Sequence, residues 1–142
     1  MFSLHQSAGR LARNLIREGK FWRCKYWGLT AGKASGGRTS GIINVPLLDG
    51  VASSEGAVAI THWKLHKFSE VENVALVEFE PRTDVPGQIE AHSRLSLRTP
   101  LMESVGLHLS EIKGCLPGGD DVTISAPAAG ALKRRLAELG FI

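Results

Sequence analysis

Hydrophobic residues alternate with polar ones in several short stretches through the middle of the chain. Glycine or proline residues separate these stretches, as at Gly50, Gly56 and Pro86. The stretches that favour β-strands are 42–45, 57–60 continuing into 63–68, 74–79, 89–97 and 122–124. Short strands at near-regular spacing predict a mainly β fold, a small barrel or a sandwich, over residues 41–126.

The two ends of the chain have helical spacing instead. Apolar residues recur every three or four positions over residues 8–20 and again over 127–142. In the second stretch Pro127 stands early and Gly140 late, an order that is typical of a helix. We therefore predict a basic N-terminal arm and Gly-rich loop over 1–40, with a helix at 8–20, and a C-terminal helical tail over 127–142.

The composition is that of an ordinary globular protein. The 142 residues are 43% hydrophobic and 22% charged, which argues against wholesale disorder and fits one domain. No run of about 18 uncharged apolar residues occurs, so no transmembrane helix is expected. Cys24 and Cys115 are too few for a disulfide framework or a cysteine-based zinc site. A reducing compartment is the simpler interpretation, and one long-range disulfide stays open.

The net charge of +3 conceals an uneven distribution of charge. The first 40 residues contain eight Lys and Arg against one acid, whereas residues 41–132 contain six against twelve acids. A basic arm on an acidic body is typical of proteins that hold a polyanion or an anionic surface. The alternative is a solvated basic helix without a partner. The first 16 residues contain Arg, Ser and His but no acid, which resembles a mitochondrial targeting segment.

A loop rich in Gly, Ser and cations spans residues 28–41. Glycines let backbone N–H groups approach a phosphate, while Lys33 and Arg38 supply charge. The alternative is a flexible linker. The preceding segment, 21–28, mixes aromatic residues with Arg and Lys, which suits stacking on bases. Its tryptophans would otherwise serve as anchors packed onto the body.

No motif in the sequence predicts catalysis. The Gly- and Lys-containing loop lacks the spacing of a nucleotide-binding phosphate loop. His62 and His66 fall on one face of a predicted strand but lack the further ligands that a metal needs. Glu78 and Glu80 have the pattern of a solvated strand end. We therefore expect no enzyme, no cofactor, no metal and no small-molecule substrate.

The loop and first predicted strand resemble a known family. They are similar to the start of the OB-like RNA-binding domain of universal ribosomal protein two of the large subunit. The similar positions form the run Leu29-Thr30-x-Gly32-Lys33-x-Ser35-Gly36-Gly37-Arg38-x-x-Gly41-x-Ile43-x-Val45. Stretches at 63–68, 77–82 and 112–122 follow in the order of that family.

Two departures shape what this resemblance implies. Residues 46–50 replace a basic run of the family, and the family's second, SH3-like domain is absent. The resemblance implies that residues 41–126 form a small OB-like barrel. It also implies a diverged, shortened structural component of the mitochondrial large ribosomal subunit, located in the matrix. Its partners would be ribosomal RNA and neighbouring ribosomal proteins. The missing domain would either be lost or be carried by a separate chain, which would then be a further partner. A non-enzymatic adaptor subunit of an organellar membrane complex is the alternative. A likeness of the tail to the SH3-like domain of ferrous-iron transport accessory proteins is interpreted as convergence.

The expected RNA contacts are spread over the arm, the loop and the body. Gly36 and Gly37 would open the backbone to phosphates. The cations expected to bind phosphates are Arg10, Arg13, Arg17, Arg23, Lys25, Lys33 and Arg38, with Lys64, Lys67 and Arg82 in second rank.

Overall fold

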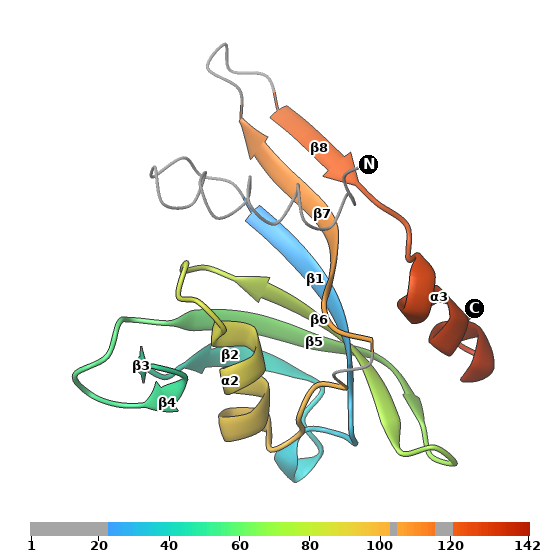
Figure 1. Cartoon of the computed structure of the whole chain (residues 1–142), viewed down its shortest axis with the longest axis horizontal. Coiled ribbons are helices and arrows are strands. Elements are labelled where there is room, and N and C mark those ends of the chain that lie inside the picture. Colours follow the sequence, from blue (N-terminus) through green and yellow to red (C-terminus); the bar gives the residue numbers. More distant parts are fainter. Residues whose placement is uncertain (1–22, 103–104, 116–120) are drawn as a thin grey trace.

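The computed structural model describes residues 23–102, 105–115 and 121–142, and its strands pair in antiparallel β-structure (Figure 1). The elements in chain order are β1 (Arg23–Thr30), η1 (Ser35–Gly37), β2 (Ser40–Asn44), β3 (Leu47–Leu48), β4 (Val51–Ala52), β5 (Ile60–Ser69), β6 (Val74–Pro81), α2 (Gln88–His92), η2 (Ser93–Leu97), β7 (His108–Cys115), β8 (Asp121–Ser125) and α3 (Gly130–Glu138). The prediction of a mainly β fold is confirmed.

The strands form an open sheet. Six of them pair in the order β2-β5-β6-β1-β7-β8, while β3 and β4 form a separate two-stranded ribbon. Within the described residues, β2 and β8 lie at opposite edges of the sheet and do not pair with each other (Figure 1). A barrel needs its edge strands to meet, so the predicted OB-like barrel is not confirmed. Helices bury the apolar residues of this sheet without closing it.

Strand β1 lies inside the sheet, although the sequence placed its residues in a basic arm. It pairs with β6 through residues 26–30 and with β7 through residues 23–27. Cys24 is buried while the adjacent Lys25 is half-exposed, so the cations of this segment point away from the core. The helix predicted over 8–20 lies outside the described residues and stays a prediction.

A helix replaces the strand predicted over residues 89–97. Here α2 continues directly into η2, which is a π-helix. Ile89, Ser93 and Leu97 are buried at intervals of four residues. The sequence of this segment therefore fits helical spacing as well as the alternation of apolar and polar residues from which a strand was predicted. Gly87 precedes the helix with a left-handed φ of 71°, a conformation that glycine adopts without a steric penalty.

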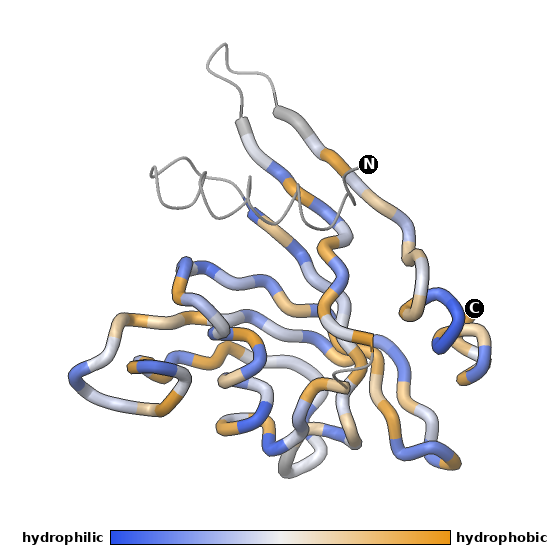
Figure 2. The backbone as a smooth tube through the Cα atoms, viewed as in Figure 1, coloured by the Kyte–Doolittle hydropathy of each residue, from blue (hydrophilic) through white to orange (hydrophobic). Residues whose placement is uncertain are grey.

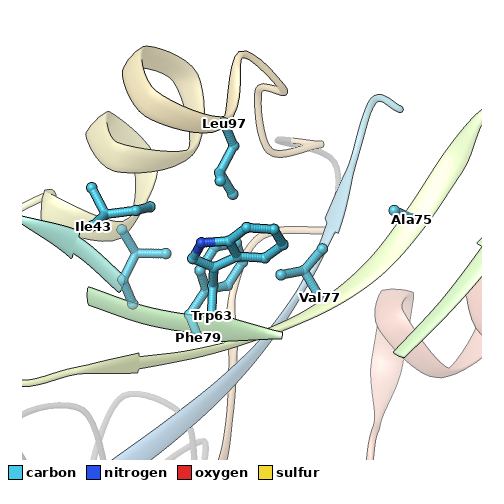
Figure 3. Close-up of a cluster of buried hydrophobic side chains, with 7 residues drawn as sticks. Ile43, Trp63, Ala75, Val77, Phe79 and Leu97 are labelled. Atoms are coloured by element: carbon cyan, nitrogen blue, oxygen red, sulfur yellow. The ribbon is translucent and has the colours of Figure 1, made fainter. Parts of the chain in front are cut away.

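The main core lies between the sheet and the α2–η2 helix. Trp63, Val77 and Phe79 from β5 and β6 pack together with Ile89 and Leu97 (Figure 3). Side chains alternate between the two faces of a strand, and Figure 2 shows hydrophobic and hydrophilic residues interleaved along these strands. The residues between the core positions therefore face the opposite side of the sheet.

Helix α3 packs on that opposite side. Leu132 and Leu136 contact Leu29, Val74 and Leu76, so this helix covers the part of the sheet where β1 and β6 are apolar on this face. A helix within 127–142 is present as predicted. None of the helices in the described part of the chain is long and apolar enough to cross a membrane.

Candidate nucleic-acid interface

A chain of buried hydrogen bonds fixes α2 against β5. The Gln88 side-chain amide donates to the Ile60 carbonyl at 3.0 Å and to Thr61 Oγ1 at 2.9 Å. Thr61 Oγ1 lies 2.8 Å from Nδ1 of His92, whose Nε2 lies 2.9 Å from the Val45 carbonyl oxygen. Because a carbonyl only accepts, Nε2 carries the proton and Nδ1 of the neutral ring accepts from Thr61. Burial lowers the pKa of His92 below its usual 6.5, which keeps the ring neutral.

We expect the free energy of unfolding to depend on His92 below neutral pH. In the unfolded chain His92 takes up a proton near pH 6.5, whereas in the folded protein its pKa is lower and the ring stays neutral. The contribution of His92 to the free energy of unfolding is therefore full above about pH 6.5 and is lost as the pH falls. His92→Phe should cost roughly 1–3 kcal/mol near neutral pH, since Thr61 and Val45 lose a partner, and should weaken the pH dependence. Urea unfolding at about pH 7.5 and 5.5 measures both effects. Equal losses in wild type and variant between these pH values would contradict the neutral ring.

The hydrogen-bonded chain borders a pocket at the start of α2. The pocket has a volume of about 80 Å³, and its lining includes Tyr26 of β1, Asp84 of the loop after β6, and Glu90 of α2. Gln88 also lines it, but its amide already holds α2 to β5. The pocket thus combines an aromatic ring with two carboxylates, while Gln88 positions the helix that carries one of them.

Cys24 is not a suitable nucleophile for this pocket. It lies in a small buried cluster with Leu109 and Ile112, against which Tyr26 packs. Burial, with a contribution from the charge of Glu80, raises the pKa of the thiol to about 11. The thiolate, which is the reactive form, is therefore nearly absent at neutral pH. The carboxylates of the pocket are better candidates for chemistry.

A larger hollow lies on the opposite face of the sheet. It has a volume of about 340 Å³ and is lined in part by His62, Lys64, Glu78 and Glu80. Lys64 is the cross-strand partner of Glu78, and His62 is that of Glu80. The opposite charges of Lys64 and Glu78 compensate each other, and Glu80 adds a further negative charge. This hollow is therefore less suited to a polyanion despite its size. Lys64, a predicted RNA contact, lies here.

Two further predicted RNA contacts are surrounded by carboxylates on the same face. Lys25 Nζ lies 3.8 Å from Glu78 and 3.6 Å from Glu111, and the Arg82 guanidinium lies 3.6 Å from Glu80. These ion pairs reduce the positive potential that would attract a phosphate. The structure thus sets Lys25, Lys64 and Arg82 beside carboxylates, although the backbone of Lys64 pairs with Ser40 at the end of the glycine-rich loop.

Two other predicted contacts have different surroundings. Lys67 Nζ donates to the carbonyl oxygen of Phe141 at 2.6 Å and so holds the C-terminal segment. Arg23 is exposed at the start of β1. Three predicted contacts lie outside the described residues: Arg10, Arg13 and Arg17.

The loop around η1 keeps its predicted residues together. Lys33 Nζ lies 4.5 Å from the centroid of the Phe68 ring, and Arg38 Cζ lies 5.9 Å from that of Trp63. Both cations are exposed and stand over aromatic rings of β5, an arrangement that orients them. The η1 glycines have φ values of 78° and 70°, which side chains rarely permit. Their contact with RNA stays a prediction.

Sequence reasoning missed the pocket. It treated Tyr26 only as part of an aromatic segment in the arm, and it did not single out Asp84 or Glu90. The available signal was the Pro86-Gly87 turn followed by buried residues at helical spacing, which would have predicted a helix beginning next to Asp84.

The comparisons with known proteins identify a fold. No protein-family model matches the chain, and no curated protein matches it. The solved structure of human RNA pseudouridylate synthase domain containing 4 matches with a TM-score of 0.71 and 17% identity, over 94% of this chain and 68% of that chain. Human RNA pseudouridylate synthase domain containing 1 matches with a TM-score of 0.60 and 16% identity, over 96% of this chain and 73% of that chain.

These matches correct several expectations. The solved structures similar to this chain are RNA pseudouridylate synthase domain proteins, so the resemblance to universal ribosomal protein two was wrong. The predicted structural role in the ribosome, with ribosomal proteins as partners, was therefore wrong as well. The alternative, an adaptor subunit of a membrane complex, is not supported by these matches either. The expectation of no enzyme and no substrate conflicts with neighbours that are named as synthases. A glycine-rich basic loop beside short strands suits any β protein that holds an anion, which is why it misled.

The mitochondrial location depends on residues outside the described part and stays a prediction. At 16–17% identity the matches speak for the fold and not for the activity. What they establish is that this chain is similar in fold to two human RNA pseudouridylate synthase domain proteins.

Proposed function

We propose that this protein is an RNA-modifying enzyme of the pseudouridylate synthase type, with RNA as its substrate. The similarity in fold to two human RNA pseudouridylate synthase domain proteins supports the reaction class. One observation carries the proposal for this chain: Tyr26, Asp84 and Glu90 meet in a single pocket on that fold.

The residue types in the pocket fit the chemistry. Conversion of uridine to pseudouridine breaks the N1–C1′ bond, forms a C5–C1′ bond and moves a proton from C5 to N1, so no oxidant or co-reactant is needed. A carboxylate can attack C1′, as it does in glycosidases, and a second one can move the proton. Enzymes that act on a base take it out of its stack and hold it against aromatic side chains.

Each pocket residue has a role in this proposal. Tyr26 is half-buried on β1 and offers its ring to the base. Asp84 is half-buried on the loop after β6 and is our candidate for the attack on C1′. Glu90 is exposed on α2 at the pocket and is our candidate for moving the C5 proton.

Release of tritium from C5 tests the proposal. RNA labelled with 5-tritiated uridine is prepared from cells that lack this protein and is incubated with the full chain. Since the hydrogen on C5 leaves during the reaction, we expect tritium to appear in water and pseudouridine in the digested RNA. Labelled RNA that keeps all its tritium after prolonged incubation would refute the proposal.

A further inference from the structure

Two segments that are distant in sequence lie side by side and form one basic ridge. Its four cations are Lys33, Arg38, Arg94 and Arg98, and we call it the η1–η2 ridge. The Ala31 amide donates to the Pro100 carbonyl at 3.0 Å, and Arg38 Nη2 donates to the Ser96 carbonyl at 3.3 Å. Residues 30 and 101 also form a β-bridge. These contacts join the η1 loop to the end of η2 (Figure 1), so cations of both segments share one surface.

Several cations elsewhere on the molecule are paired with carboxylates. Lys25, Arg82, Lys113 and Arg135 each lie within ion-pair distance of a carboxylate. Counting only residues that the structure describes, Lys33, Arg94 and Arg98 form no ion pair with a carboxylate. Their charge is therefore available to an external anion.

Three of these side chains are also held in place. Lys33 and Arg38 stand over the rings of Phe68 and Trp63, and Arg94 Nη2 donates to the carbonyl oxygen of Gly50 at 3.0 Å. Side chains that are already ordered lose less conformational entropy when a ligand binds. The ridge is thus suited to binding an anion and not merely to remaining soluble.

The backbone at Arg98 gives a second, independent indication. Arg98 has a φ of 61° at the end of the π-helix η2, where glycine would be more stable. Non-glycine residues in this region, and π-helices, concentrate at functional sites.

The ridge leads away from the pocket along one helix. Glu90, Arg94 and Arg98 are exposed and spaced four residues apart. Glu90 lies in α2, Arg94 lies in η2 and Arg98 directly follows η2, so the two cations are successively farther from Glu90 along the helix. An RNA strand that places one nucleotide in the pocket would therefore cross Arg94 before it reaches the η1 loop.

We infer that the η1–η2 ridge binds successive phosphates of the RNA strand that delivers a uridine to the pocket, with Arg94 and Arg98 as contacts. This inference rests on the proposed function and deepens it by giving the substrate strand a path. Phosphate contacts would fix the position of the strand without reading its sequence.

A pair of double variants with the same charge change tests the ridge. Arg94→Gln with Arg98→Gln removes two charges from the ridge, and Lys133→Gln with Arg134→Gln removes two exposed charges from α3 on the other face. The probe is a fluorescein-labelled single-stranded RNA of about 20 nucleotides and mixed sequence, titrated at several salt concentrations. We expect the ridge variant to bind about tenfold more weakly and to lower the salt slope by about 1.4, because each lost phosphate contact removes about 0.7. The α3 variant should match wild type.

Arg98→Gly separates binding from folding. Glycine relieves the left-handed backbone, so this variant should melt no lower than wild type while it binds the RNA more weakly. If Arg98→Gly and the ridge double variant both bound the RNA with wild-type affinity, the inference that the ridge binds RNA phosphates would be refuted. The proposed function would be unaffected by that result.

Two other outcomes are also decisive. Wild-type protein that binds no RNA at any salt concentration would refute the proposed function itself. If the ridge double variant lost binding to phosphatidylserine vesicles but kept wild-type affinity for RNA, the partner would be a membrane and the inference would be wrong.

Discussion

Asp84→Asn is expected to slow tritium release from 5-tritiated uridine in RNA by at least about a thousandfold, because loss of a nucleophile commonly costs this much or more. An amide keeps the size of the side chain but cannot attack C1′. RNA affinity should change little, since Asp84 contributes no positive charge to the strand's path. Tritium release and fluorescence anisotropy, measured on the same preparation, test the two statements separately.

Glu90→Gln should have a smaller effect, about a hundredfold, as is typical when a group that moves a proton is removed. The matched control is Glu55→Gln, an identical change at an exposed position that does not line the pocket. The control should retain wild-type rates. If both pocket variants also retained them, the chemistry would have to be assigned elsewhere on the protein.

Phe79→Ala is expected to bring the protein close to unfolding. Phe79 is 0% exposed and packs in the main core with Trp63, Val77 and Leu97 (Figure 3). Truncation of a fully buried phenylalanine costs about 3–5 kcal/mol, whereas a domain of this size is stable by about 5–15 kcal/mol. Urea unfolding followed by circular dichroism measures the loss.

The control for this core variant is Val71→Ala, in the turn between β5 and β6. Val71 is 94% exposed, so its truncation should change the free energy of unfolding by less than about 0.5 kcal/mol. A loss below about 1 kcal/mol for Phe79→Ala would mean that the core between the sheet and α2 contributes little, contrary to the packing seen here.

The local pattern of apolar and polar residues was sufficient to predict a strand or helix where one face of that element is apolar. The alternation around Trp63 and Phe79 predicted β5 and β6, because each strand has one face in the core. The spacing of Leu132 and Leu136 predicted α3 for the same reason. Local pattern also located the basic loop that contains Lys33, since glycine and charge are readable without knowledge of the neighbours.

Local pattern failed where a distant partner decides the outcome. In β1 it predicted a basic arm, because nothing near Lys25 in sequence shows that Glu78 and Glu111 face it from the two adjacent strands. The apolar residues of 89–97 fit both the alternation of a strand and the spacing of a helix. Burial of Ile89 and Leu97 against Trp63 and Phe79 selected the helix.

By itself the sequence determined which segments have a buried face and where positive charge is dense. The tertiary structure alone decided that Tyr26 meets Asp84 and Glu90 in one pocket and that the loop of Arg38 lies against η2. The physical reason is that the pairing of β1 with β6 and β7 joins residues that are 45 to 90 positions apart in sequence. No local propensity encodes which distant strand will supply the partner.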